Sequence, residues 1–403
     1  MSKLGPEEEH VSDVANNHFL DLVCARLRSA RPGAGVGDDF STRIETVRGA
    51  PFVSLWFRTR GCRHDARGGC TMCNYGASTA VSGDEMVEAV RNGLATLDPN
   101  DDMTLLLSPS GSMFDEWEVP ARAREQIFRL AHEARLRTVL CETRAETLTD
   151  GLVRGFAGLF DDREAGIGIG LESANPWILK YVVNKALSLD DYRAAMALLH
   201  RHGVLSTANV LLGSPFLSEA EAIDDAVDAI QWAFTAGSDQ CVLFPAHVKS
   251  HTLLHWLWQR NMYSPPSLWS LVRVLSRVGP DQASRMTISW YKDYFASNET
   301  ADADKDPLFL CSPTTCPDCR DDVMALLDSY RDEGDFDVIR DLARFDCDCR
   351  RHWEGSLEYP VASRLAERVA VGYEAIGRDL LGDEWWLRHG HAVIKDVLRG
   401  ASW

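Results

Sequence analysis

Residues 52–76 are FVSLWFRTRGCRHDARGGCTMCNYG, an apolar run that passes directly into a loop rich in glycine and cysteine. The run Phe52–Phe57 predicts a buried strand. Cys62, Cys70 and Cys73 follow it with the spacing C-x7-C-x2-C. In barrels of parallel strands, the loops after the strands line one mouth of the sheet. The stretch therefore predicts a strand with a reactive site at its end.

The alternation of apolar runs and helical patterns continues to about residue 250. The further runs are Met103–Leu107, Thr138–Cys141, Ile167–Leu171, Thr207–Leu212 and Cys241–Phe244, and the helical patterns cover 83–96, 121–134, 145–158, 188–202 and 218–236. Continuous apolar strands between helices indicate a parallel sheet. Six such units predict an α/β fold, a partial (β/α)6 barrel of the TIM type.

Both ends of the chain depart from this alternation. Residues 12–30 predict an amphipathic helix, followed by a Gly/Pro linker. A strand-like piece at Met286–Tyr291 precedes a charged, cysteine-rich segment and a helical tail. We expect an N-terminal helical extension (1–50), the partial barrel (51–299) and a C-terminal cysteine-rich module that binds a metal or cluster and ends in a helical tail (300–403).

The net charge of −18 disfavours binding to a phosphate backbone. The sequence contains no run of eighteen apolar residues, so we expect no membrane span. The polar N-terminus resembles neither a signal peptide nor a transit peptide. We therefore expect a cytoplasmic protein with reduced thiols. Grouped cysteines in such a protein usually bind metal, and eight of the eleven cysteines fall into two groups.

The first group suits an iron–sulfur cluster. Three thiolates can hold three irons of a [4Fe-4S] cluster and leave the fourth iron open for the amino and carboxylate groups of S-adenosylmethionine (SAM). A reduced cluster can then cleave SAM to a 5′-deoxyadenosyl radical. Spacing alone also allows a zinc site with His64 as fourth ligand.

Polar residues follow the next strands in the same way. Ser110, Gly111 and Ser112 come after the second strand, where a loop could bind the SAM ammonium, although Ser/Gly turns are common. Glu142 and Arg144 follow the third strand and alternate, so they are predicted to share one face. Such a pair can bind an amino-acid zwitterion or form a surface ion pair.

Later strand ends carry further polar residues. Glu172 ends an apolar strand, where an unpaired carboxylate is costly, so it faces the barrel mouth or caps the next helix. Asn209 lies in the fifth strand, and His247 and Lys249 follow the sixth. Each of these is more often structural than functional.

The second group is Cys316, Cys319, Cys347 and Cys349, in the pairs CPDC and CDC, with Cys311 as a fifth candidate. Four thiolates could bind a structural zinc ion or a second, auxiliary [4Fe-4S] cluster. The close C-x-C pair is unusual for a zinc ribbon and slightly favours the cluster, which could bind substrate, relay electrons or donate sulfur.

Taken together, these segments resemble the radical SAM family of archaeosine biosynthesis, which is related to elongator-type and MiaB-type proteins. The matching segments are GCRHDARGGCTMCNYG, SGSMFDEWEVP, ETRAE, IGLESAN, NKALSLDDY, LLGSPFLSEAEAIDD, PAHVKSHTLLHWLW and PPSLWS, with the late CPDC and CDC pairs and Trp353. They cover about residues 50–355.

The resemblance implies a radical SAM enzyme with a role for each matching residue. It places cluster ligation on Cys62, Cys70 and Cys73. SAM contacts fall on Met72, Tyr75, Ser110, Gly111, Ser112, Asp115, Glu142 and Arg144. Glu172, Asn184 and Lys185 match further motif positions and are our candidate catalytic residues. Flavodoxin or ferredoxin is the expected electron donor.

Members of this family cleave or form bonds near sulfur on a modified tRNA base. This sequence departs from that pattern in its acidic charge and in lacking a recognisable RNA-binding domain. It also differs from the family motifs at Gly213-Ser214-Pro215 and Arg144-Ala145. We therefore expect a small nucleoside, nucleotide or sugar substrate and sulfur insertion in specialised metabolism, such as nucleoside antibiotic biosynthesis. Modification of tRNA is the first alternative, and a non-catalytic zinc-binding protein is the second.

Overall fold

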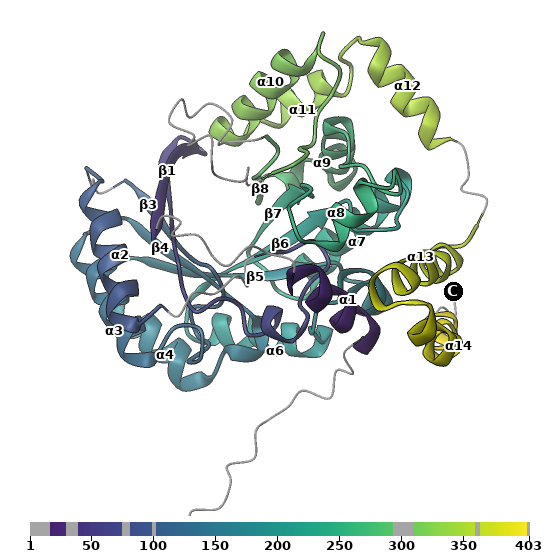
Figure 1. Cartoon of the computed structure of the whole chain (residues 1–403). Coiled ribbons are helices and arrows are strands. Elements are labelled where there is room, and N and C mark those ends of the chain that lie inside the picture. Colours follow the sequence, from purple (N-terminus) through teal and green to yellow (C-terminus); the bar gives the residue numbers. More distant parts are fainter. Residues whose placement is uncertain are drawn as a thin grey trace, which may run out of the picture.

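The computed structural model describes residues 17–29, 39–74, 81–98, 102–292, 309–358 and 363–400. These residues form one curved sheet with helices on its outer face (Figure 1). The strands are β1 (Phe40–Val47), β2 (Ala50–Phe57), β3 (Thr104–Pro109), β4 (Thr138–Thr143), β5 (Glu164–Glu172), β6 (Leu205–Leu212), β7 (Gln240–Pro245) and β8 (Met286–Ile288).

Helices follow most of the strands, and others flank the sheet. They are α1 (His18–Ser29), α2 (Gly83–Ala95), α3 (Ala121–Glu133), α4 (Asp150–Leu159), α5 (Pro176–Ile178), α6 (Leu189–Arg201), α7 (Glu219–Thr235), α8 (Leu253–Trp258), α9 (Leu268–Ala283), α10 (Arg320–Glu333), α11 (Phe336–Leu342), α12 (Asp348–Leu357), α13 (Leu365–Leu381) and α14 (Asp383–Gly400). Short η1 (Asp65–Arg67), η2 (Ala145–Thr147) and the π-helical η3 (Leu179–Val183) complete the set.

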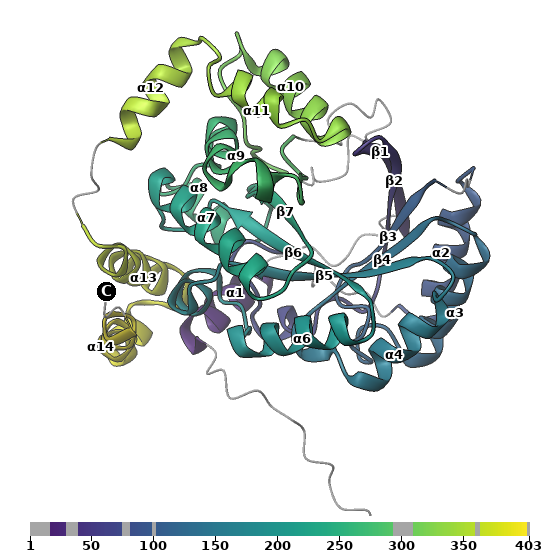
Figure 2. The same ribbon diagram turned by 180° about the vertical axis from the view of Figure 1, so that it is seen from behind.

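The sheet order is β1-β2-β3-β4-β5-β6-β7-β8, and β2 to β8 pair in parallel. This confirms the predicted α/β partial barrel. Because each crossover returns to the neighbouring strand, the loops after the strands collect at one mouth. Seen from behind, α4 and α6 lie against the outside of the strands (Figure 2). Their apolar faces and the outward strand residues form the main core, which includes Ile167, Ile169 and Leu171.

The structure differs from the sequence prediction at the first edge of the sheet. The predicted N-terminal extension, 1–50, contains α1 and also β1, which pairs antiparallel with β2. β1 alternates between half-buried and exposed residues, so it has no apolar run. At the other edge, β8 is shorter than the predicted strand Met286–Tyr291.

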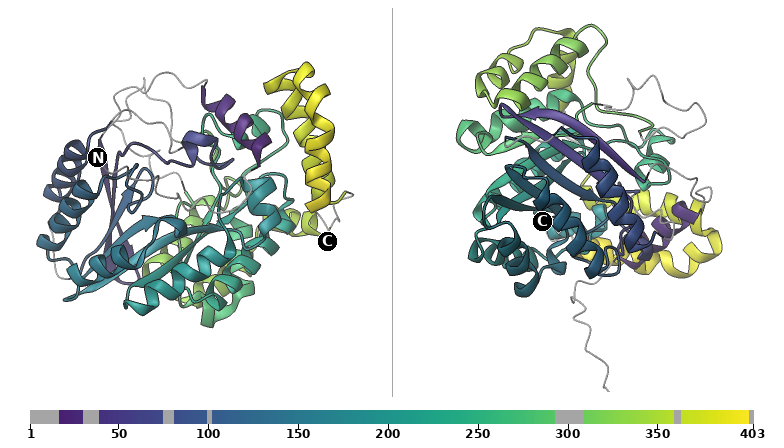
Figure 3. Two further views of the ribbon diagram at one scale, coloured as in Figure 1. Left: turned by 90° about the horizontal axis from the view of Figure 1, so that it is seen from below. Right: turned by 90° about the vertical axis from the view of Figure 1, so that its left-hand side faces the viewer.

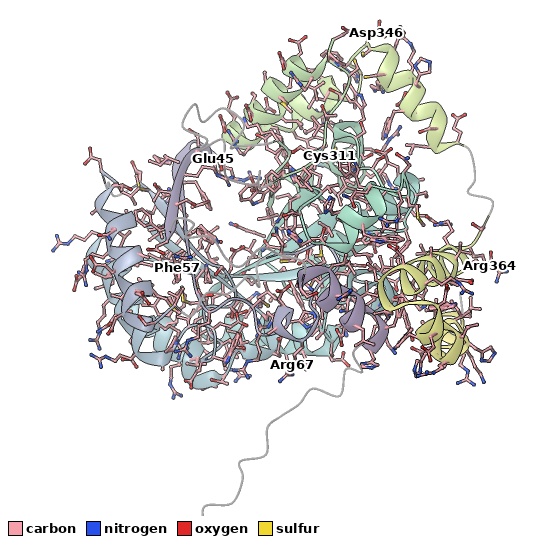
Figure 4. All side chains as sticks on the ribbon, viewed as in Figure 1. Glu45, Phe57, Arg67, Cys311, Asp346 and Arg364 are labelled. Carbon is pink, nitrogen blue, oxygen red and sulfur yellow. The ribbon has the colours of Figure 1, made fainter. Side chains whose placement is uncertain are left out.

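The segment after β8 connects the two edges of the sheet. At the end of α10, the backbone carbonyl of Arg331 accepts a hydrogen bond from the N–H of Arg48, at the β1–β2 turn (3.1 Å). The hydroxyl of Tyr330 donates to the carbonyl of Ala283, just before β8 (3.1 Å). The guanidinium of Arg331 also pairs with Glu45 on β1 (2.6 Å), which Figure 4 labels. Helix α10 therefore bridges the open side of the partial barrel.

The C-terminal helices form a second packing layer. α13 and α14 pack against each other and against α1 (Figure 3). The ring of Phe19 on α1 lies 4.5 Å from that of Tyr373, centroid to centroid. The two helices form the helical tail that the sequence predicted, and they pack against α1. No helix in the described ranges has the length and apolar character needed to cross a membrane.

The bridge by α10 gives a stability prediction. Arg331 and Glu45 are both about nine-tenths buried, with side-chain exposures of 9% and 11%. We expect Arg331→Leu to lower the free energy of unfolding by about 2 kcal/mol, because it removes the charged hydrogen bond between α10 and β1, while Glu45 keeps its pair with Arg43 (2.9 Å). The exposed pair Arg340–Asp337 supplies the control, since Arg340→Leu should cost less than about 0.5 kcal/mol. Urea unfolding measures both, and equal effects would contradict the bridging role.

Candidate active site at the mouth of the sheet

The loop after β2 carries the first three cysteines at the predicted mouth. Cys62, Cys70 and Cys73 are half-buried, and η1 lies between the first two. Gly68 and Gly69 have φ values of +133° and +75°, which side chains rarely adopt. A Cβ at Gly68 would overlap the Cα of Asp21, and one at Gly69 would lie 2.7 Å from the Cα of Asp65. These glycines let the loop lie flat against its neighbours.

Helix α1 holds this loop from one side. The guanidinium of Arg28 donates to the carbonyl oxygens of Cys70 (3.0 Å) and Cys73 (2.9 Å). It also forms a buried ion pair with Asp65. An arginine fork can reach two carbonyls at once, so it fixes the spacing of the two cysteines. The N-terminal extension is therefore part of the site.

Asn184 supports the same loop. It ends η3 in the left-handed conformation (φ 56°), which asparagine tolerates better than most residues. Its Nδ2 donates to the carbonyl of Gly69 and to Asp21, both at 2.9 Å. Its own carbonyl lies 2.7 Å from Nε2 of His64. His64, which the sequence allowed as a zinc ligand, is thus held by the backbone, and Asn184 acts on the position of the loop.

The loop after β3, which is predicted to bind SAM, is hydrogen-bonded to its neighbours around the loop that carries Cys62, Cys70 and Cys73, called the cluster loop from here on. Oγ of Ser110 accepts a hydrogen bond from the N–H of Thr59 (2.8 Å), and Oγ of Ser112 accepts one from the N–H of Arg144 (3.2 Å). Gly111 packs directly against the carboxylate of Glu118. Backbone and hydroxyl groups therefore lock this loop beside Cys62.

Arg144 is the centre of an ion-pair network. Its guanidinium pairs with Asp115 (2.6 Å), Glu118 and Glu146 (2.6 Å) and donates to Sγ of Cys62 (3.5 Å). Asp115 also accepts from the guanidinium of Arg63 in the cluster loop (2.8 Å). Burial raises the pKa of Glu118, and Arg144 opposes that rise. The network fixes the positive charge of Arg144 next to a cluster thiol.

Glu142 points in a different direction from Arg144. Its carboxylate accepts hydrogen bonds from Oγ of Ser108 on β3 (2.7 Å) and Nδ2 of Asn209 on β6 (3.1 Å). These contacts place it across the inner face of the sheet. Burial raises its pKa. The strand ends at Thr143, so the alternation that would put Glu142 and Arg144 on one face stops before Arg144.

The inner face of β5 carries no side chains where it passes this carboxylate. Gly166, Gly168 and Gly170 alternate along the strand and therefore share one face. A Cβ at Gly168 would lie 3.6 Å from Cγ of Glu142, and one at Gly170 would lie 2.6 Å from Nζ of Lys185. The glycines leave room for polar side chains above the strand.

Glu172 and Lys185 form an ion pair above Gly170. Nζ of Lys185 lies 3.0 Å from Oε1 of Glu172, and the side chains are 14% and 9% exposed. Glu172 follows an irregularity in strand pairing and has φ of +66°, a strained value for glutamate. Its other oxygen, Oε2, is buried and has no hydrogen-bond partner among the described residues. Such an orphaned acceptor at the mouth is free to bind a ligand.

The turn after Glu172 is fixed from the outside. Oγ of Ser173 donates to Asp225 on α7 at 2.6 Å, and both side chains are buried. Burial raises the pKa of Asp225 to about 7. Burial lowers the pKa of Lys249, and the nearby Cys73 and Glu172 oppose that lowering. Nδ1 of His247 lies 3.0 Å from Oγ of Ser312.

The buried thiols of Cys62 and Cys70 need nearby positive charge before they lose their protons. Burial raises the pKa of Cys62 to about 12 and that of Cys70 to about 11, while Arg144 and Lys185 oppose the two rises. A bound iron–sulfur cluster supplies the positive charge that keeps such thiols deprotonated. Three half-buried thiols in a glycine-rich loop, with two cations beside them, fit a [4Fe-4S] cluster.

Met72 and Tyr75 are the two remaining residues that are predicted to contact SAM. Met72 lies within the cluster loop, partly buried against the apolar cluster that includes Phe19. Tyr75 lies outside the described residues. Apart from Tyr75 and the second cysteine group, the structure gathers the predicted site residues around the mouth. It divides them into those that hold loops and those that face inward.

The second cysteine group lies away from the mouth. The Sγ atoms of Cys316, Cys319, Cys347 and Cys349 are all within 4.8 Å of one another and could hold a second cluster or a metal ion. Cys311 is not part of this group. Figure 4 labels Arg67 in the first cysteine loop and Asp346 beside Cys347, at opposite ends of the view.

The sequence prediction missed Arg28, Asp21 and Glu118. Arg28 and Asp21 lie on a helix that precedes the sheet, and Glu118 is one of three acidic residues in SMFDEWEVP. Nothing in the local pattern separates the fully buried Glu118 from the exposed Glu116. Only the fold brings these residues to the cysteine loop.

Comparison with curated proteins finds relatives along most of the chain. The archaeosine synthase subunit beta of Methanosarcina acetivorans is 27% identical over 330 residues, which cover 80% of this chain and 88% of the relative. The protein of the same name in Thermococcus kodakarensis is 28% identical over 242 residues, 58% of this chain and 74% of the relative. These relatives confirm the resemblance predicted from the motifs.

No family model matches the chain. Among solved structures, methylornithine synthase has a TM-score of 0.44 at 11% identity and covers 84% of this chain and 91% of its own. Elp3 of Methanocaldococcus infernus has a TM-score of 0.43 at 16% identity and covers 62% of this chain and 59% of its own.

The tight packing at Gly68 gives a second prediction. We expect Gly68→Ala to reduce the iron bound after anaerobic reconstitution to less than half, because the new Cβ would collide with the backbone of α1. Gly155→Ala on α4 is the matched control, since nothing lies within 4 Å of that position. Iron and sulfide assays of both variants measure the effect. Full iron content in Gly68→Ala would show that the contact with α1 does not shape the loop.

Proposed function

We propose that this chain is a radical SAM enzyme of the archaeosine synthase and elongator type, and that it acts on a small nucleoside-, nucleotide- or sugar-type substrate in carbon–sulfur bond formation. Its cofactors are SAM and a [4Fe-4S] cluster, which supplies the electron that cleaves SAM to methionine and a 5′-deoxyadenosyl radical. The observation that carries the proposal is the buried Glu172–Lys185 pair beside the cysteine loop.

This chain's residues would divide the binding of SAM between them. Arg144 is occupied by three carboxylates, so it serves to hold the cluster loop. Lys185 also lies near Cys70, and its ammonium is suited to the SAM carboxylate. Burial lowers its pKa, but Glu172 and Cys70 together outweigh burial and raise it, so the ammonium stays charged. Glu142 and the free Oε2 of Glu172 can accept hydrogen bonds from an ammonium or a ribose hydroxyl.

The acidic charge of the chain supports a small substrate. At −18, the whole-molecule field repels a polyanion. The radical would remove one hydrogen atom from a substrate carbon, forming 5′-deoxyadenosine. The carbon radical would then bond to an iron-bound sulfide of the sulfur donor, whose ferric iron would take up the remaining electron and be reduced to the ferrous state. A one-electron donor such as flavodoxin or ferredoxin would reduce the cluster before each cleavage.

Modification of tRNA is the second candidate function. It is favoured by the two relatives named archaeosine synthase subunit beta. That name also suggests a partner subunit for this chain. Binding of tRNA would need a local basic surface on an acidic protein, and it would weaken steeply with added salt.

The function is tested by anaerobic assay of the reconstituted protein with SAM and dithionite. We expect 5′-deoxyadenosine from the native protein and none from Cys70→Ala, with Cys141→Ala, a buried cysteine outside both groups, as control. Deuterated nucleosides, nucleotides and sugars with a sulfide source then reveal the substrate, since deuterium enters 5′-deoxyadenosine. Deuterium transfer only from a tRNA substrate, with a tRNA gel shift at low salt, would select the second function.

The proposed role of Lys185 has its own test. Lys185→Met should raise the KM for SAM about 10- to 100-fold, the usual effect of losing a charged hydrogen bond. Lys180→Met is the matched control, because Lys180 lies on η3, five residues before Lys185, but pairs with Asp396. Iron content checks that the cluster loop of each variant is intact. An unchanged KM with full iron would remove Lys185 from the SAM site.

A further inference from the structure

Four cysteine thiols meet where α10 and α12 begin. Sγ of Cys316 lies 3.5 Å from that of Cys319 and 3.6 Å from that of Cys347. Sγ of Cys319 lies 3.5 Å from that of Cys349. The whole set fits within 4.8 Å. These sulfur–sulfur distances distinguish a site for a single metal ion from a site for an iron–sulfur cluster.

A single tetrahedral ion and a cubane cluster demand different spacings. Zinc binds thiolates at about 2.3 Å, so four sulfurs around one zinc ion lie about 3.8 Å apart. In a [4Fe-4S] cluster each thiolate binds a different iron at a corner of the cube, which separates the sulfurs by roughly 6 Å. The observed distances match the first arrangement. We propose that Cys316, Cys319, Cys347 and Cys349 bind one tetrahedral Zn²⁺ ion and not a second iron–sulfur cluster.

The helices at the site support a closed four-thiolate ion. Cys319 and Cys347 occupy the N-cap positions of α10 and α12, so the positive ends of both helices face the thiolates. The indole N–H of Trp269 on α9 donates to Sγ of Cys349 (3.3 Å). Such donors offset the double negative charge of a zinc ion with four thiolates. Making room for eight cluster atoms would require the two helix starts to separate.

The position of the site gives the ion a structural role. Helix α10 bridges β1 and the start of β8, and the cysteines join its first residues to α12 and, through Trp269, to α9. Few large side chains are fully buried in this segment, among them Val323, Leu327, Ile339 and Leu342. A zinc ion can supply much of the folding free energy of so small a module. The ion therefore fastens the bridge across the open side of the sheet.

A zinc ion also changes the proposed chemistry. A mononuclear thiolate site contains no sulfide, so it cannot donate sulfur to a substrate. The sulfide donor for the carbon–sulfur bond would then bind elsewhere. This consequence rests on the proposed function, whereas the identity of the metal does not.

Metal and sulfide analysis of the full chain tests the inference. After anaerobic reconstitution we expect about one zinc, four irons and four sulfides per chain, the counts of one ion and one cluster. Zinc X-ray absorption should show four sulfurs at about 2.3 Å. About eight irons and eight sulfides without zinc would overturn the proposal. A fifth iron in place of zinc would overturn it as well.

Variants separate the two sites. Cys347→Ser with Cys349→Ser should lose zinc and keep the iron, while Cys70→Ala should lose iron and keep zinc. Cys311→Ala, in the same segment but outside the four-thiol group, should keep both metals. If the double variant fails to fold, thiol titration of the native protein with a colorimetric zinc indicator gives the same answer. Zinc in a protein that forms no 5′-deoxyadenosine would sustain this inference while removing the proposed function.

Discussion

The buried ion pair between Glu118 and Arg144 is the interaction on which the geometry of the site depends. The carboxylate of Glu118 is fully enclosed, and it accepts hydrogen bonds from the backbone N–H groups of Arg63 and Ser112 as well as from Arg144. These donors come from the loops after β2, β3 and β4. A buried carboxylate is costly unless such donors surround it. The charge therefore forces three separate loops into one arrangement beside Cys62.

A second set of contacts holds the cysteine loop from the opposite side. Arg28 and Asp21 on α1 and Asn184 at the end of η3 bond the backbone or each other around Gly69 and Cys70. Helix α1 is in turn held by α13. Within residues 58–74, the part of the loop that the structure describes, η1 is the one element of regular secondary structure, so the shape of the loop depends on these neighbours. Side chains from α1 and from the end of η3 thus preorganise the loop for a cluster before the cluster binds.

The fold was predictable where each element has its own local signal. The strands β2 to β7 are apolar runs between helical patterns, and that pattern alone gave the partial barrel. β1 was not predicted, because its residues are half-buried or exposed and its strand conformation depends on pairing with β2. The three cysteines were predictable from spacing, but Arg28 and Glu118 were not, since they meet the loop across 42 and 55 residues of sequence. Contacts between residues so far apart in the sequence cannot be predicted from the local residue pattern.

The two cysteine groups are built for different duties. Cys62, Cys70 and Cys73 lie in one glycine-rich loop at the mouth, and three ligands leave one iron of a cluster open to substrate or cofactor. The later four belong to two helix starts, and four thiolates close the coordination of a single ion. Open coordination suits chemistry, whereas closed coordination suits stability. Because α10 ties both edges of the sheet, a closed site there stabilises the curvature of the sheet. That curvature brings Glu172, with its partner Lys185, close to Cys70 of the first group.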